Sequence, residues 1–116
     1  MDDFEWINRD NIFTFDSSSF SYRNGTETGF LRIKKSVIFY HFSFFINTNL
    51  SVGSYRVGTF KSPYIPRIIH SNLTSVSGST YNADVNVAPN YLELMMKTGQ
   101  ATAGSWAWGV GTFYYA

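Results

Sequence analysis

The chain of 116 residues contains no cysteine, and His41 and His70 are its only histidines. Disulfides, thiolate metal sites and cysteine nucleophiles are therefore excluded, and a zinc site has almost no ligands to draw on. The sequence also lacks a phosphate loop, a dinucleotide fingerprint, a nucleophile elbow and a His-Glu-x-x-His motif. We therefore expect no enzyme, no cofactor and no bound metal.

Charged residues are scarce as well, at 15% of the chain, against roughly 25% in an average soluble domain. Nine Lys and Arg nearly balance eight Asp and Glu, and the net charge of +1 creates no field that would attract nucleic acid. The longest apolar run, Val37 to Ile46, is interrupted by His41 and Ser43 and is too short for a membrane-spanning helix. The start, Met1 to Glu5, is acidic, unlike a signal peptide. We expect neither nucleic acid nor a membrane as partner.

Aromatic residues are abundant: 11 Phe, 8 Tyr and 3 Trp make up 19% of the chain. Together with Val, Ile and Thr they form short runs separated by Gly, Ser and Asn, which is typical of an all-β protein. The length fits one domain, and we find no internal repeat or linker. We therefore treat residues 1–116 as a single domain, with residues 1–10 as a candidate N-terminal connector.

Alternation of apolar and polar residues predicts eight or nine short strands and hence an antiparallel β-sandwich or jelly roll. Arg23 to Thr26 contains Asn-Gly and predicts a tight turn. Pro63 and Pro66 predict a rigid surface crossing. The candidate strands are 11–15, 20–22, 30–34, 37–46, 55–60, 67–71, 74–77, 81–87, 91–97 and 106–115. Among them 20–22, 67–71 and 74–77 are the weaker candidates, and 81–87 forms a hairpin with 91–97.

Two of these segments carry large apolar side chains on both faces. The run 37–46 has an apolar row at its even positions and also Phe39 and Phe45 on the other side. The run 106–115 has Phe113 and Tyr115 on one face and, on the other, Trp106, Trp108, Val110 and Tyr114. Because a lone sandwich buries one face of each strand and large exposed apolar patches mark interfaces, we predict a homo-oligomer packed through outer sheet faces. The alternative is that bulges and twist bring every ring into one core.

Asn82, Asp84 and Asn86 alternate along one strand face, about 7 Å apart, a spacing that suits the hydroxyls of a sugar. Tyr91, Trp106 or Trp108 would cover the sugar ring, and His70 is a further candidate contact. The simpler alternatives are a solvated strand face and, for the tryptophans, packing between subunits. For His41 we expect a hydrogen bond within the sheet or within an interface. Asp84 and Glu93 would satisfy the separation of about 5 to 10 Å between glycosidase acids, but so would any acids on neighbouring strands.

Several features from Gly29 onward point to one family. They are the basic hairpin Leu31 to Lys35, the long strand after it, the crossing Pro63 to Arg67, the strand end Asp84 to Pro89 and the C-terminal Gly109 to Tyr115. In this order the chain resembles the C-terminal receptor-binding head domains of tail-tip and baseplate proteins from bacteriophages of Gram-positive bacteria. The resemblance covers about three-quarters of the sequence.

The resemblance implies a homotrimeric β-sandwich in the virion that binds host cell-wall saccharide near subunit boundaries and contacts other tail or baseplate proteins. In several such heads the late strand alternates His and Asp, and the next strand carries Trp; here Asp84, Asn86 and Met95 stand at these positions. One alternative is a structural module that holds other baseplate proteins. Another is a lectin-like or cytokine-like module of unrelated origin.

Overall fold

The chain folds as an all-β domain, as the sequence predicts. The computed structural model describes residues 4–23, 28–67, 70–76, 82–88 and 90–115, and for 70–76, 82 and 88 it describes the backbone only. A short 3-10 turn, Arg9–Asn11, follows the first strand. The strands are β1 (Glu5–Ile7), β2 (Phe13–Phe15), β3 (Phe20–Tyr22), β4 (Gly29–Lys34), β5 (Val37–Ile46), β6 (Gly53–Phe60), β7 (His70–Val76), β8 (Asn82–Ala88), β9 (Tyr91–Met96) and β10 (Trp106–Tyr114).

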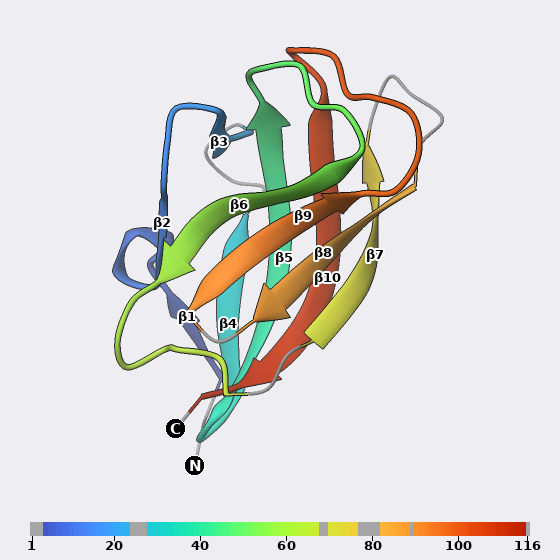
Figure 1. Ribbon diagram of the computed structural model, residues 1–116. Coiled ribbons are helices and arrows are strands. Elements are labelled where there is room, and N and C mark those ends of the chain that lie inside the picture. Colours follow the sequence, from blue (N-terminus) through green and yellow to red (C-terminus); the bar gives the residue numbers. More distant parts are fainter. Residues whose placement is uncertain (1–3, 24–27, 68–69, 77–81, 89, 116) are drawn as a thin grey trace.

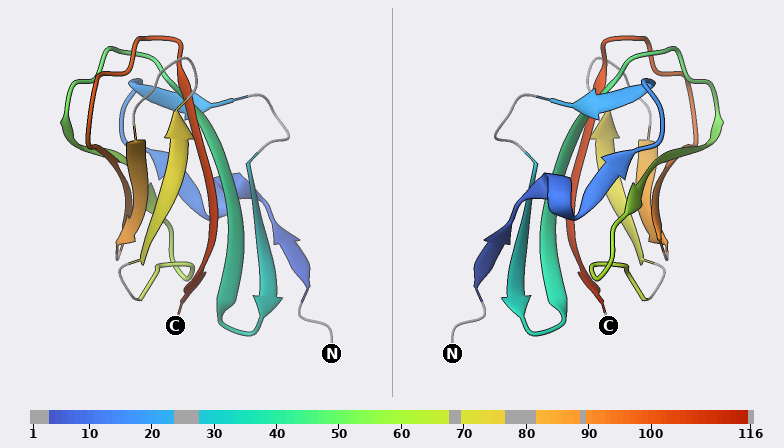
Figure 2. Two further views of the ribbon diagram at one scale, coloured as in Figure 1. Left: turned by 90° about the vertical axis from the view of Figure 1, so that its right-hand side faces the viewer. Right: turned by 90° about the vertical axis from the view of Figure 1, so that its left-hand side faces the viewer.

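All described strand pairs are antiparallel, and they form one ten-stranded sheet in the order β1-β4-β5-β10-β7-β8-β9-β6-β2, with β3 added to the end of β5. The sheet folds over into a sandwich. Strands β6 and β9 cross in front of β5 and β10 (Figure 1), and β7 connects the two layers at one side (Figure 2). We call β1, β4, β5 and β10 the back layer, and β8, β9, β6 and β2 the front layer.

Most expected strands are confirmed, and β5 has the bounds that alternation predicts. The hairpin of β8 and β9 is confirmed too, with Asn90 in the left-handed region at φ 71°. The weak candidates 67–71 and 74–77 are a single strand, β7. Strand β1, within the candidate connector 1–10, was not expected, because three residues carry too little alternation. Most of the expected turn at Arg23 to Thr26 lies outside the described residues.

The core lies between the layers and depends on contacts between aromatic rings. The even positions of β5, from Ile38 to Ile46, are all buried. The ring of Phe13, from the front layer, lies 5.0 Å from that of Phe42 in the back layer, and the rings of Phe60 and Phe113 are 5.3 Å apart across the same gap. These edge-to-face contacts stabilise beyond the area they bury.

Strand β4 buries a different row from the one its alternation suggests. Leu31 and Ile33 form an apolar row in the sequence, yet Phe30 is the fully buried residue and Leu31 is only half-buried. The register explains this, because Phe30 pairs with the buried Tyr40, whereas Leu31 pairs with Phe39 on the outer side of β5. The apolar side chain of Leu31 therefore lies on the outside of the sandwich.

A β-bulge in β6 changes which residues share its outer face. Arg56 pairs with Glu93 and Gly58 pairs with Leu92, so Val57 is an extra residue. Arg56 and Thr59 consequently face outward together. Gly58 is tightly enclosed, since a Cβ there would lie 2.4 Å from the carbonyl oxygen of Thr14 and 2.3 Å from the ring of Phe13.

We predict that Gly58→Ala lowers the free energy of unfolding by about 2 kcal/mol, because the methyl group meets backbone that cannot move aside. Denaturant titration measures this loss. Gly29→Ala is the matched control: the nearest atom to its Cβ is Cζ3 of the exposed Trp6, at 2.9 Å, and this ring is able to shift. Equal losses in the two variants would contradict the explanation.

The phenol of Tyr22 is buried without a hydrogen-bond partner among the described residues. Its ring contacts that of Phe15, with centroids 4.7 Å apart, and the guanidinium of Arg9 lies 3.9 Å from its centroid. Burial raises the pKa of Tyr22, and the charge of Arg9 opposes this only in part. The hydroxyl group therefore stays neutral in the folded protein where the unfolded chain would ionise it.

We predict that Tyr22→Phe leaves stability unchanged or raises it by about 1 kcal/mol at neutral pH, because an unsatisfied buried hydroxyl is removed. The raised folded pKa means that the wild type loses stability as pH rises above about 10, and Tyr22→Phe should reduce this alkaline loss. Tyr55→Phe is the control and should lose about 0.5 to 1 kcal/mol, because the Tyr55 hydroxyl donates to the Ser51 carbonyl at 2.9 Å. Denaturant titration over a pH series measures all three proteins.

Candidate functional site

The predicted saccharide-binding residues are distributed over both outer faces of the sandwich. Asn82, Asp84 and Asn86 lie on β8 and Tyr91 on β9, in the front layer, while Trp106 and Trp108 lie on β10, in the back layer. His70 is on β7 and pairs with Val87. The side chains of His70 and Asn82 are outside the described part of the structure. The fold therefore separates Asp84, Asn86 and Tyr91 from the two tryptophans, whereas Asn82 lies two strands from Trp108 in the ladder.

Asp84 and Asn86 are less accessible than alternation along β8 suggests. Ala83, Val85 and Val87 point inward and are buried, as expected. Asp84 points outward but is only 8% exposed, because the ammonium group of Lys97 lies 2.6 Å from its carboxylate. The side-chain amide of Asn86 contacts the sulfur of Met95. The alternative of a freely solvated strand face is therefore wrong for Asp84.

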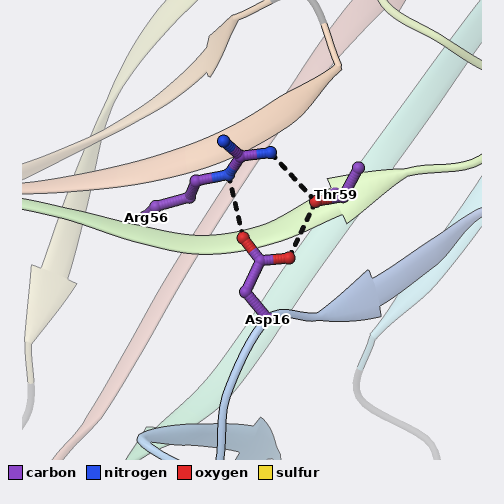
Figure 3. A network of polar contacts seen from close by, with 3 residues as sticks. All are labelled: Asp16, Arg56 and Thr59. Carbon is purple, nitrogen blue, oxygen red and sulfur yellow. Dashed lines mark hydrogen bonds and ion pairs between the residues drawn. The ribbon is translucent and has the colours of Figure 1, made fainter.

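Tyr91 lies beside a polar network that the sequence did not predict. Figure 3 shows this network, which consists of Asp16, Arg56 and Thr59. The carboxylate of Asp16 forms an ion pair with Arg56 Nε at 2.8 Å and accepts a hydrogen bond from the hydroxyl of Thr59 at 2.7 Å. Arg56 Nη2 also donates a hydrogen bond to the Thr59 hydroxyl at 3.2 Å. The guanidinium of Arg56 lies 4.7 Å from the centroid of the Tyr91 ring. One face of Tyr91 is thus covered. The signal for this network was Gly58 within a strand pattern, which favours a bulge.

Trp106 is covered in a similar way. It is the first residue of β10, pairs with Phe45 of β5 and is half-buried. The guanidinium of Arg23, at the end of β3, lies 4.2 Å from its ring centroid, in cation–π geometry. Trp106 therefore packs against residues of its own chain.

Trp108 presents a more open ring, 43% exposed. It pairs with Ser43 of β5 on one side and with Ser75 of β7 on the other, and Ser75 in turn pairs with Asn82 of β8. The β5 backbone beside it is fixed by Thr28, whose hydroxyl donates to the Ser43 carbonyl at 2.9 Å and accepts from the Ser43 amide at 3.0 Å. Trp108 thus presents an exposed flat ring on β10, next to β7, the strand that connects the back layer to the front layer.

The outer side of the back layer carries a group of apolar residues that we call the apolar face: Trp6, Leu31, Val37, Phe39, Val110 and Tyr114. Trp6 is 68% exposed and Tyr114 57% exposed. Trp6, Leu31 and Phe39 lie in one row across three strands, and Val37 pairs with Tyr114. The alternative that every large apolar side chain enters one core is therefore wrong. His41 lies in the same sheet, paired with Val110, and is half-buried.

Within the described ranges no group of three or more His, Asp or Glu side chains is placed to hold a metal ion. Asp84 and Glu93, the acids weighed above as a glycosidase pair, are not directly opposite: Asp84 pairs with Met95 and Glu93 with Asn86. In the same part of the chain, no helix has the length and apolar character needed to cross a membrane.

Comparison of the chain with protein-family models, with curated proteins and with solved structures finds no match. Its function must therefore be argued from the two outer faces themselves.

We predict that Asp16 and Arg56 couple by about 0.5 to 1 kcal/mol at low salt in a double-mutant cycle with alanine, and that added salt weakens the coupling, since both side chains are partly exposed. Unfolding titrations of the wild type, both single variants and the double variant measure it. The control cycle pairs Arg56 with Glu93, its ladder neighbour. Stronger coupling to Glu93 than to Asp16 would contradict the network in Figure 3.

Proposed function

We propose that this chain is a non-catalytic attachment domain that binds a saccharide on the surface of Gram-positive cells through Trp108. The exposed ring of Trp108 is the observation that carries the proposal. Flat aromatic rings cover the C–H face of a sugar, and a few placed polar groups then fix its orientation. The resemblance to phage receptor-binding heads supports a place at the tail tip or baseplate of a virion.

The backbone ladder brings two polar residues of the sequence close to Trp108. Ser75 lies next to Trp108, and Asn82 follows on the next strand, about 10 Å along the ladder from the tryptophan. This span suits one or two sugar units. Because Arg23 and Arg56 already lie over Trp106 and Tyr91, the stacking role is assigned to Trp108 among the aromatic candidates.

A site formed by one ring and a few polar groups binds weakly, and useful attachment then requires many copies acting together. A tail tip or baseplate presents its subunits in multiple copies, which fits this requirement. The other tail proteins would hold the domain, and the saccharide would be bound without chemical conversion.

The competing function is a structural module that holds other baseplate proteins. The apolar face favours it, because a large exposed apolar patch is typical of a protein contact. The two functions differ in one property: a purely structural module has no affinity for cells.

A fluorescent fusion of the domain, applied to a panel of Gram-positive strains with and without competing wall polysaccharide, tests the proposal. We expect labelling that the polysaccharide suppresses. Trp108→Ala should reduce binding of soluble polysaccharide, measured by calorimetry, by about tenfold, because the stacking surface is lost. Val52→Ala is the control, since Val52 is 60% exposed on a separate loop.

Three results would contradict the proposal. Failure to label any strain of the panel favours the structural module. Full binding by Trp108→Ala places the saccharide elsewhere. Release of reducing ends from the polysaccharide would show that the domain is an enzyme after all.

A further inference from the structure

We propose that the exposed ring of Tyr114 is a second saccharide subsite, and that the sugar bound there carries a negatively charged group, a phosphate or a carboxylate. This subsite rests on the proposed saccharide-binding function and adds the chemical class of the saccharide. The outward residues of the second half of β10 are Trp108, Val110, Thr112 and Tyr114. Tyr114 is 57% exposed, and its Cα atom lies about 20 Å from that of Trp108 along the strand. One or two sugar units on Trp108 do not reach it, so Tyr114 is a separate subsite.

Lysine residues border Tyr114 on one side, where the end of β10 lies beside the β4–β5 hairpin (Figure 1). Tyr114 pairs with Val37 at the start of β5, and Val37 pairs with Lys34 at the end of β4. Because paired residues of antiparallel strands share a face, Lys34 belongs to the outer face, two strands from Tyr114. The side chains of Lys34 and of Lys35, in the turn that follows, are both exposed.

Arg67 lies on the other side of Tyr114. Its amide donates to the Tyr114 carbonyl at 2.9 Å, and the preceding residue, Pro66, pairs with Tyr115. Pro66 and Tyr115 are buried, whereas Arg67 and Tyr114 are exposed, so the last two share the outer face. Opposed Cβ atoms are about 5 Å apart. The guanidinium of Arg67 is therefore within reach of a charged group on a sugar that stacks on Tyr114.

The positive charge around Tyr114 is not neutralised within the part of the chain that the structure describes. No carboxylate there forms an ion pair with Lys34, Lys35 or Arg67. Glu5 contacts Arg32 instead, and Arg32 belongs to the core side of the sheet, since it pairs with a buried residue of β5. Three exposed cations thus surround one ring without a described acid to match them.

Tyr114 also differs from the aromatic residues that are already covered. Arg56 lies 4.7 Å from the ring centroid of Tyr91, and Arg23 lies 4.2 Å from that of Trp106. Among the described residues no cation lies over the ring of Tyr114 in this way. An open ring covers the C–H face of a sugar, and cations beside it bind a phosphate or carboxylate substituent through charge-assisted hydrogen bonds. The arrangement therefore favours an anionic sugar over a neutral one.

The position of this subsite also favours a sugar chain over nucleic acid. Trp108 and Tyr114 lie on the same outward side of one strand, so a single extended chain of sugars can contact both rings. Two linked subsites bind more tightly than either alone. Three cations on a domain of net charge +1 are too few for nucleic acid, which is bound through many phosphate contacts.

Calorimetry with wall polysaccharide from the strains of the panel tests the inference. The polysaccharide is used intact, after removal of phosphate with hydrofluoric acid, and after reduction of its carboxylates to alcohols, with samples matched in size. We expect one of the two treatments to weaken binding by the wild type about fivefold, which identifies the charged group. Arg67→Gln and Lys34→Gln should each weaken binding of the intact polymer about threefold, because exposed charges contribute modestly. Both variants should bind the neutralised polymer like the wild type.

Two further variants separate the ring from the charge. Tyr114→Ala should weaken binding of every form about fivefold, and Tyr114→Phe should bind like the wild type because the ring remains. Lys97→Gln is the matched control for charge, since it removes one positive charge in the front layer, where Lys97 pairs with Asp84. Circular dichroism checks that each variant folds. If Tyr114→Ala does not fold, Arg67→Gln decides alone.

Three results overturn the inference: a neutralised polymer that binds as tightly as the intact one, an Arg67→Gln variant that binds like the wild type, or an equal loss in Lys97→Gln and Arg67→Gln. Attachment through Trp108 then still stands if Trp108→Ala weakens binding. Failure of the wild type to bind any polysaccharide overturns both proposals. The whole chain is used, so Asp2 and Asp3, which lie outside the described residues, are present in every measurement.

Discussion

The two-residue period of β5 constrains the rest of the molecule. Among its even positions, Phe42 meets Phe13 and Phe44 meets Phe15, both from the front layer, and these contacts hold the layers together. The same period sends Phe39 and Phe45 to the other side, where the sandwich has no third layer. Folding requires β5 to be apolar on one face, but this strand carries apolar side chains on both. The additional apolar side chains lie on the outer surface.

Much of the fold follows from alternation that is long enough to read. The ten residues of β5 and the hairpin of β8 and β9 are predictable because the alternation of inward and outward residues repeats several times along these strands. Strand β1 has three residues and no repeat to recognise, so only its pairing with β4 defines it. On β4 the choice of buried row was decided by register, since Phe30 lies opposite Tyr40.

The candidate site was less predictable than the fold, because residue type does not reveal which rings are already occupied. Trp106, Trp108 and Tyr91 look equivalent in the sequence, but arginines that are distant along the chain lie over Trp106 and Tyr91. Asp84 stands at an outward position of the alternating pattern, where a solvated residue is expected, but Lys97 covers its carboxylate. Contacts of this kind depend on tertiary neighbours that a single sequence does not place.

The bulge at Val57 ties together residues that are far apart along the chain. Arg56 and Thr59 share a face only because one extra residue separates them, and Asp16 binds both. If the strand were paired regularly at its present length, Arg56 and Thr59 would lie on opposite faces, because side chains alternate along a strand, and Asp16 could bind only one of them. Loss of Val57 would instead leave them two residues apart and still on one face. Over evolutionary time this acid should therefore persist with either the bulge or a single residue between its two partners.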